Sequence, residues 1–282
     1  MRVIKGISLG IIAGILLGCS FTVNIPSIKT GDVKTIKIDE SFPATTVTPV
    51  LRLEMGAGTL NVAPGSSSMV SGEVRYNIQE WEPVIERLNQ GVAITQTSTS
   101  TVGIPEGSVI NDWNLQLGNQ LMEMEISAGA YSGNLDLSGV PLASLQINDG
   151  ASKASVQFNS PNPAVMQRLV YKTGASQVSI EGLANANVQE LQFDGGAGAY
   201  TLDFGGTLHQ DISCSIRTGM SDVKIIIPQG DHARITLTGG LNNAVTTGTW
   251  MVNGTTYETG SGSPTIDIKV EMAVGNLSLI LK

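Results

Sequence analysis

Cysteine is scarce in this sequence, since the 282 residues include only Cys19 and Cys214. If Cys19 is chemically modified, as its context below predicts, no intramolecular disulfide can form and the fold must be held by its apolar core. An uninterrupted helical pattern is also missing, whereas 33 glycines accompany many Ser, Thr, Asn and Val residues. This composition predicts an all-β protein.

Positive charge is scarce as well. Lys and Arg together number 16 against 24 Asp and Glu, and the sequence contains no basic stretch. Removal of residues 1–18 would take away Arg2 and Lys5 and leave a side-chain charge of −10. A chain of this charge is repelled by polyanions. We therefore expect no nucleic-acid partner.

The N-terminal apolar run is too short for a membrane span. Ile7–Leu17 follows two basic residues and ends at Gly18 and Cys19. It is about half of the ~20 residues that a spanning helix needs, so it predicts an export signal rather than a permanent anchor. The tetrapeptide Leu16–Cys19 resembles a bacterial lipobox, in which the Cys thiol takes a diacylglycerol and the chain is cut before it. The resemblance implies a signal peptide at residues 1–18 and a lipoprotein attached to a membrane through acyl chains, such as palmitate, on Cys19; ordinary secretion is the alternative.

The rest of the chain divides by pattern. We expect residues 19–48 to form the lipidated Cys and a tether, with one strand around Lys34–Ile38, and residues 49–282 to form one solenoid domain. Within this domain we expect an irregular part at 49–120, regular coils at 121–240, and a hairpin with a C-terminal cap at 241–282. The segment Thr97–Asn111, TSTSTVGIPEGSVIN, predicts an exposed loop.

A glycine recurs at a nearly constant spacing through this domain. The last six of its positions lie 21, 24, 22, 23 and 21 residues apart, which predicts a solenoid with repeats of ~22 residues. The positions are Gly56, Gly129, Gly150, Gly174, Gly196, Gly219 and Gly240.

Apolar residues alternate on both sides of each glycine. Around Gly196, for example, Leu191 and Phe193 precede the glycine, and Tyr200 and Leu202 follow it. Each repeat therefore predicts two strands with one buried face, joined at a tight bend. Stacked repeats of this kind predict a β-helix-like column with parallel strands about 4.8 Å apart.

The stretch Phe193–Phe204, FDGGAGAYTLDF, could form a phosphate loop, a calcium-binding repeat or a structural turn. A phosphate loop needs a following helix, but residues 200–204 alternate as a strand. The calcium repeat needs a carboxylate at the position of Tyr200. The glycines therefore predict turns where coils stack closely.

Several other residues have both a structural and a functional interpretation. Cys214 falls in an apolar column, which predicts a buried small hydrophobe rather than a reactive thiol. His209 and His232 lie in predicted corners without a nucleophile in reach. We predict no catalytic residues, no metal site and no cofactor.

Two sets of charged residues are expected to align along the column. Asp136, Glu181 and Asp203 share an exposed repeat position and predict an acidic ladder, which could attract a cation or a sugar amine or could simply be solvated. The next set, Lys172, Asp194 and Arg217, predicts an alternating-charge ladder worth ~0.2–1 kcal/mol per pair.

The C-terminal part departs from the repeat. Asn253-Gly254 predicts a two-residue hairpin turn that sets Trp250 opposite Tyr257. This aromatic pair either covers the end of the column or offers a partner surface, and we favour the structural lid. The segment Ile266–Leu281 repeats the core pattern with Ala273 at the glycine position, so we expect it to close the column.

Four stretches of this sequence resemble a known family. They resemble the bacterial toast-rack domains, including the form with its own N-terminal toast-rack segment. The stretches are LRLEMGAGTLNVAPG, VRYNIQEWEP, GASQVSIEGLANANVQELQFDGGAGAYTLDFGG and VEMAVGNLSLIL. The family is related to cell-wall-active antibiotic response proteins. The resemblance covers about Val50–Lys282 and implies a toast-rack β-solenoid. Some of these relatives are membrane-associated sensors of envelope stress, others are called proposed adhesins, and the family has no agreed catalytic residues to transfer.

These expectations combine into one functional hypothesis. We expect a lipid-anchored lipoprotein of the cell envelope, outside the cytoplasm, either on the outer face of the cytoplasmic membrane or on the periplasmic side of an outer membrane. It would serve as a non-catalytic, adhesin-like binding or scaffold module for an envelope protein or a cell-wall glycan. The alternatives are an accessory to cell-envelope stress sensing and a carbohydrate-active β-helix enzyme, which would need two or three converging acids or bases.

Overall fold

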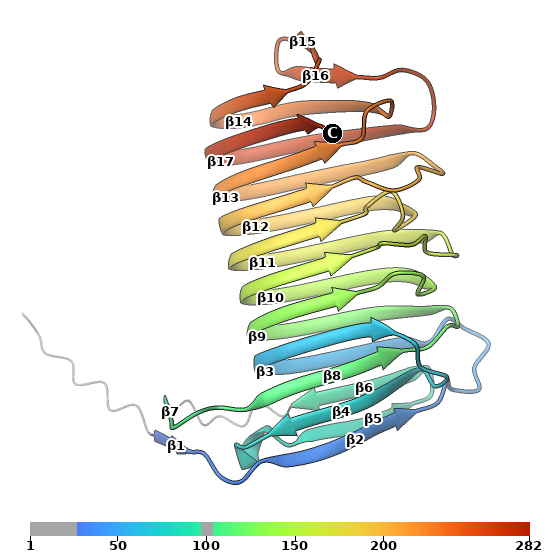
Figure 1. The fold of residues 1–282 in the computed structure, drawn as a ribbon, viewed down its shortest axis with the longest axis vertical. Helices are drawn as coiled ribbons and strands as arrows, with labels where there is room; N and C mark the ends of the chain where they lie inside the picture. The colour runs from blue at the N-terminus through green and yellow to red at the C-terminus, as the bar shows by residue number, and fades with distance from the viewer. Residues whose placement is uncertain (1–26, 97–103) are drawn as a thin grey trace, which may run out of the picture.

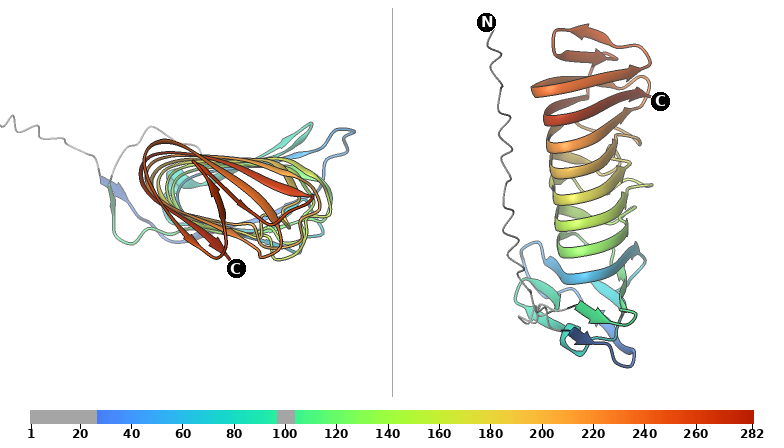
Figure 2. Two further views of the ribbon diagram at one scale, coloured as in Figure 1. Left: turned by 90° about the horizontal axis from the view of Figure 1, so that it is seen from above. Right: turned by 90° about the vertical axis from the view of Figure 1, so that its left-hand side faces the viewer.

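The protein is a β-sheet wound into a column of stacked coils (Figure 1). The computed structural model describes residues 27–96 and 104–282. Over these residues fifteen strands form one sheet, two short strands form a second, and Gln79–Trp81 forms a 3-10 turn. Seen along the column, the coils superimpose as a flattened ring (Figure 2). The predicted all-β, β-helix-like fold is confirmed.

Each regular coil is one long strand that bends in the middle. The sequence predicted two strands per repeat, but the parallel pairing continues on both sides of the bend, so a single strand covers both faces of the coil. The long strands are β3 (Val50–Pro64), β9 (Met122–Asp136), β10 (Leu142–Gln157), β11 (Met166–Glu181), β12 (Val188–Asp203), β13 (Ile212–Ile227), β14 (His232–Thr247) and β17 (Thr265–Leu281).

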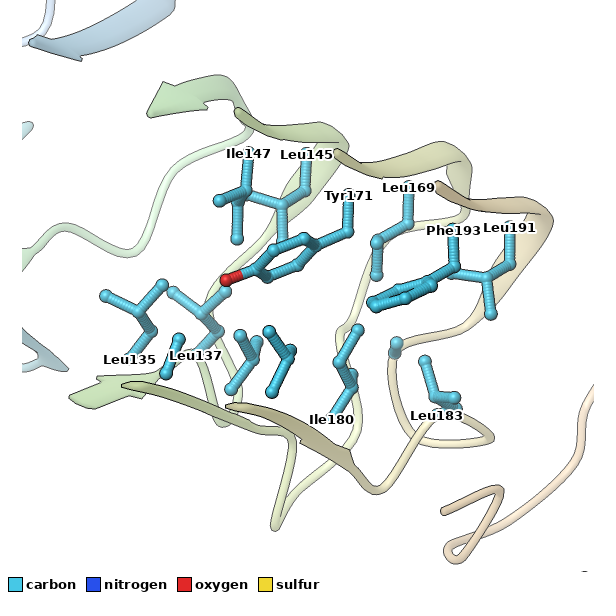
Figure 3. Packing of buried hydrophobic residues seen from close by; sticks show 14 of the residues in the cluster. Leu135, Leu137, Leu145, Ile147, Leu169, Tyr171, Ile180, Leu183, Leu191 and Phe193 are labelled. Atoms are coloured by element: carbon cyan, nitrogen blue, oxygen red, sulfur yellow. The ribbon is translucent and has the colours of Figure 1, made fainter. Parts of the chain in front are cut away.

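Neighbouring coils pair in the register that the repeat predicts. Leu145 lies beside Leu169, and Leu169 lies beside Leu191. Because side chains alternate along a strand, such columns all point into the coil. Figure 3 shows them facing Leu135 and Leu137 from the opposite wall. Each buried aliphatic side chain stabilises the fold by about 1.5–3 kcal/mol.

Cys214 belongs to this core. Its side chain is 2% exposed, it lies beside Leu191, and burial raises the pKa of its thiol. The prediction of a buried thiol is confirmed. We expect it to react slowly, because a thiol that stays protonated is a poor nucleophile.

The N-terminal end of the column is built differently. Its strands are β2 (Lys34–Glu40), β4 (Val70–Tyr76), β5 (Pro83–Leu88), β6 (Gly91–Gln96) and β8 (Asn111–Leu117), and the separate pair is β1 (Ser27–Lys29) with β7 (Ile104–Glu106). Along one edge β3 pairs first with β6 and then with β8. These two strands therefore take the place of one coil, whereas each regular coil is a single strand that continues through its bend.

Buried amides compensate for this split coil. Asn111 donates from Nδ2 to the Ala57 carbonyl at 2.5 Å, and Gln96 donates from Nε2 to the Trp81 carbonyl at 2.7 Å. The two side chains also bond to each other. They satisfy backbone groups that would otherwise be buried without a partner, which costs about 1–3 kcal/mol each.

The segment expected to be a tether is folded from Ser27 onward. The predicted strand near Lys34–Ile38 is present as β2, but it pairs along its whole length with β4. Ile38 is 2% exposed, and Glu40 accepts two hydrogen bonds from Arg87 at 2.6 and 2.7 Å. The alternating apolar residues of β2 are needed to cover the core at this end.

The last strand lies inside the column and does not close it. β17 is inserted between β13 and β14, parallel to both, which corrects the sequence-based expectation. The reason is that β16 (Thr256–Thr259) occupies the outer edge of β14 at Ala233–Thr236, with β15 (Met251–Asn253) beyond it. The hairpin β15–β16 is therefore the outermost element at this end (Figure 1).

Substitution of Gly275 tests how closely these coils approach. Its φ is +144°, and an added Cβ would lie 1.7 Å from the Ser221 carbonyl oxygen, so Gly275→Ala should destabilise the protein by at least ~2 kcal/mol. Gly56 has no heavy atom within 4 Å of the same position, so Gly56→Ala is the matched control. Urea unfolding measures both, and equal stability of the two variants would contradict the packing described.

Candidate functional site

The predicted lipidation residue Cys19 lies outside the described residues. Among residues 27–96 and 104–282, no helix is long and apolar enough to cross a bilayer. Lipidation of Cys19 stays a prediction.

The predicted acidic ladder forms, and one oxygen of each of its two aspartates accepts a hydrogen bond at a corner. Asp136, Gln157, Glu181 and Asp203 lie side by side in consecutive coils. Asp136 Oδ1 accepts from the backbone N–H two residues later at 3.1 Å, and Asp203 Oδ1 accepts likewise at 2.7 Å. This contact stabilises turns. Attraction of a cation stays a prediction, and in the described part of the chain no group of three His, Cys, Asp or Glu is placed to hold a metal ion.

The predicted alternating-charge ladder is confirmed, with Asp194 between its two basic residues. Lys172 lies beside Asp194, and Asp194 beside Arg217. Arg217 donates to both Asp194 oxygens, at 2.8 and 3.2 Å. Burial alone would raise the pKa of the Asp194 carboxyl, but the hydrogen bonds from Arg217 and Gln192 and the charge of Lys172 hold this pKa below its usual range.

The hairpin turn lies one residue later than predicted, which shifts the pairing of its strands by two residues. Val252, rather than Trp250, lies opposite Tyr257, so the turn is Gly254-Thr255. Tyr257 also pairs with the buried Ile235. Directly paired residues of antiparallel strands point to the same face, so this register directs the Tyr257 ring toward the core.

Both predicted aromatic residues cover the end of the column. Trp250 and Tyr257 are partly buried and pack against the apolar core. Trp250 donates from Nε1 to the Thr247 carbonyl at 3.2 Å. Met251 and Val252 are instead 63% and 57% exposed. The aromatic pair is thus placed as a lid, while neighbouring hairpin residues face solvent.

Sequence reasoning missed a hollow on one outer face near the N-terminal end. It has a volume of about 720 Å³ and is lined by residues of β2, β3, β4, β8, β9 and β10. A second hollow of about 370 Å³ continues it across β10, β11 and β12 and shares Asn134 and Ser155 with it. We call the two together the polar trough. Its central row, one residue per coil, is Asn114, Asn61, Asn134, Ser155, Ser179 and Thr201.

Side-chain amides bond to one another along the first part of the trough. Asn134 donates from Nδ2 to Asn61 Oδ1 at 3.0 Å, and Asn61 donates from Nδ2 to Asn114 Oδ1 at 2.9 Å. All these bonds point the same way along the column. No local sequence signal reveals this row, because its first members come from strands far apart in the chain.

Another hollow, of about 540 Å³, lies at the bend beside the split coil. It is lined by Trp81, Glu80, Glu54, Gln96 and Asp149 among others. Two of its polar groups are engaged internally, because Gln96 bonds to Asn111 and Asp149 accepts from Tyr171 at 2.8 Å.

Together these features define a parallel β-solenoid with a filled core and open polar hollows on its surface. Residues 27–166 match the family described as the N-terminal domain of toast_rack, DUF2154. Over residues 27–166 the chain belongs to the toast-rack family, as the resemblance predicted.

Solved structures of similar fold come from several bacteria. A proposed cell-adhesion protein from Clostridium sporogenes is 17% identical, with 89% of this chain and 99% of that chain covered and a TM-score of 0.45. A proposed adhesin from Parabacteroides merdae is 11% identical, with 90% and 99% covered and a TM-score of 0.40. A proposed lipid-binding protein from Parabacteroides distasonis is 9% identical, with 89% and 99% covered and a TM-score of 0.36. No curated protein matches the chain significantly.

The ion pair of Asp194 predicts a pH-dependent effect. Because its folded-state pKa is lowered, this stabilisation is present above the unfolded pKa and is lost as pH falls through the folded pKa. Arg217→Gln should lower the free energy of unfolding slightly at pH 7 and leave it unchanged in strong acid. Lys224→Gln, on the same strand, is the control. Urea unfolding at both pH values measures the effect, and an equal loss at both would refute it.

The lid is tested by the double variant Trp250→Ser with Tyr257→Ser. Loss of two partly buried rings should lower the free energy of unfolding by roughly 2–4 kcal/mol. Met251→Ser with Val252→Ser removes exposed hairpin residues instead and should change it by less than about 0.5 kcal/mol. If the aromatic double variant melted like the wild type, the lid would be the wrong interpretation.

Proposed function

We propose that the protein is a non-catalytic binding module of the cell envelope, held at a membrane by a lipid on Cys19. This proposal rests on the difference between the filled apolar interior of the column and its hollowed outer surface. The interior is filled by packed apolar side chains, whereas the large hollows are open grooves on the outer faces. Such grooves suit a ligand that lies along the surface rather than a substrate enclosed for reaction.

The charged residues support a binding role over catalysis. Asp136 and Asp203 are engaged in corners, and Asp194 is paired with Arg217. General acid–base catalysis needs a titrating group that can approach a substrate with its proton or lone pair available. These carboxylates instead contribute to the fold.

The position of the anchor would orient the column. Cys19 precedes Ser27 by eight residues, a length of chain that spans about 27 Å at most. β1, which begins at Ser27, lies at the N-terminal end of the column (Figure 1). Ten strand spacings separate β2 from β14, so the C-terminal end would stand roughly 50 Å farther from the membrane.

The hairpin favours a second candidate function. Met251 and Val252 are exposed at the outermost strand, beside a lid that holds them in place. Exposed apolar residues of this kind favour contact with a protein partner. This would be the role of an accessory in envelope stress sensing.

Cys19→Ser tests the anchor. The serine hydroxyl cannot replace the thiol as the acylated group, so the variant should remain uncleaved or be released from the membrane. Fractionation and metabolic labelling with fatty acid measure this, and Cys214→Ala is the matched control that should stay labelled. A Cys19→Ser protein that still incorporates fatty acid would contradict the proposal.

A further inference from the structure

The polar trough provides hydrogen-bonding capacity without a net charge. Lys37 and Glu73, which line it, form an ion pair at 2.5 Å with each other. Asp136 lines it too, but its Oδ1 accepts from the Ser138 N–H and hydroxyl. The exposed Lys153 also lines it, so Asp136 and Lys153 add one charge of each sign and the charges of the lining sum to zero. The other polar side chains of the lining are amides and hydroxyls. A neutral ligand therefore fits this surface better than an ionic one.

The amide row leaves both donors and acceptors available. An Asn amide has two N–H donors and an oxygen with two lone pairs. Among the contacts of the described residues, Asn134 uses its N–H but not its oxygen, and Asn114 uses its oxygen but not its N–H groups. Farther along the row, Thr201 makes no side-chain hydrogen bond within the described chain. A ligand with many groups that both donate and accept would match this mixture.

The spacing of the row discriminates between extended polymers. Successive members of the row are one strand spacing apart, about 4.8 Å. An extended peptide laid along the column presents groups on one side every ~6.6–6.8 Å, so it would fall out of step after one or two coils. A pyranose unit advances a linear glycan by slightly more than one strand spacing. Hydroxyl groups project from both edges of each ring, so every unit can offer a group to the row even where successive units are turned over.

We infer that the polar trough binds a neutral linear glycan, laid along the column with about one sugar unit per coil. Sugar hydroxyls and acetamido groups would bond to the amides of Asn61, Asn114 and Asn134 and then to the hydroxyls of Ser155 and Thr201. This inference rests on the proposed binding function and names its ligand class. The trough lacks an aromatic side chain among its lining residues, so each sugar unit binds weakly and affinity depends on chain length.

The hollow beside Trp81 fits this ligand less well. It offers an aromatic ring, but Gln96 and Asp149 are already held by internal hydrogen bonds. Its charged lining residues, Glu54, Glu80 and Asp149, are all acidic. A neutral glycan would gain fewer new hydrogen bonds there than in the polar trough.

Binding is tested with the full-length protein in nanodiscs and neutral oligosaccharides of two to six units. Suitable probes are β-1,4-linked N-acetylglucosamine, β-1,4-linked glucose and mannose oligomers, with oligogalacturonate as an anionic comparison. Calorimetry should detect at least one neutral series, with affinity rising about tenfold or more from two to six units. Oligogalacturonate should bind more weakly than the neutral hexamer.

Matched variants locate the site. Asn61→Ala with Asn134→Ala should weaken hexamer binding about tenfold or more and leave the melting temperature nearly unchanged, because these side chains lie at the surface. Gln146→Ala, an exposed amide on the first half of β10, should bind like the wild type.

Three results would overturn the inference: no neutral hexamer binds at millimolar concentration, the asparagine double variant binds as well as the wild type, or a Trp81→Ala variant loses binding while the asparagine variant keeps it. None of them depends on the lipid, because Cys19→Ser protein should bind the same oligosaccharides. A failure of the anchor and a failure of the glycan site are therefore distinguishable.

Discussion

The structure depends on in-register parallel pairing of coils that share one bend. At the bend, the carbonyl oxygen of Gly150 lies 2.4 Å from where a Cβ of Gly174 would be, and Gly174 stands in the same relation to Gly196. This close approach gives successive coils nearly the same cross-section. Equal cross-sections put every repeat position into a column, inside and outside. The apolar core, the charge ladder and the amide row all follow from that single constraint.

The sequence was sufficient wherever the structure is set by neighbouring repeats. The column of Leu145, Leu169, Leu191 and Cys214 follows from alternation and spacing alone, and so does the Asp194–Arg217 pair. The order of coils at the C-terminal end does not follow, because similar coils can pair with any similar edge. β17 lies inside the column because the hairpin already covers part of β14, and a repeat pattern contains no information about that competition.

The candidate site was less predictable than the fold for a related reason. The polar trough forms where the flat stack of β3, β9 and β10 meets the antiparallel strands β8, β4 and β2. Its position depends on the split coil, in which Asn111 and Gln96 replace the bend. Single-sequence reasoning predicted an exposed loop at residues 97–111. In the described part of this segment, Ile104–Glu106 instead form β7 and the buried Asn111 begins β8, which together with β6 takes the place of one coil. The hairpin turn was misplaced by one residue because the Asn-Gly pair is a strong turn signal, whereas the turn in the structure is Gly254-Thr255.

In a solenoid of this kind, the residues that determine stability differ from those that can recognise a ligand. Its core residues are fixed by the stack, so only outer positions can vary without loss of packing. The row from Asn114 to Thr201 uses such positions, one per coil, and the same coils supply the hydrophobic columns behind it.

The polar trough begins at the N-terminal end, the end that an anchor at Cys19 would hold nearest the membrane. A glycan bound there would run away from the membrane along the column, so the length of chain engaged would depend on how many coils keep a small polar residue in the row. Lys224 on β13 ends that series of small side chains, which limits the glycan to about six units, the number of residues in the row.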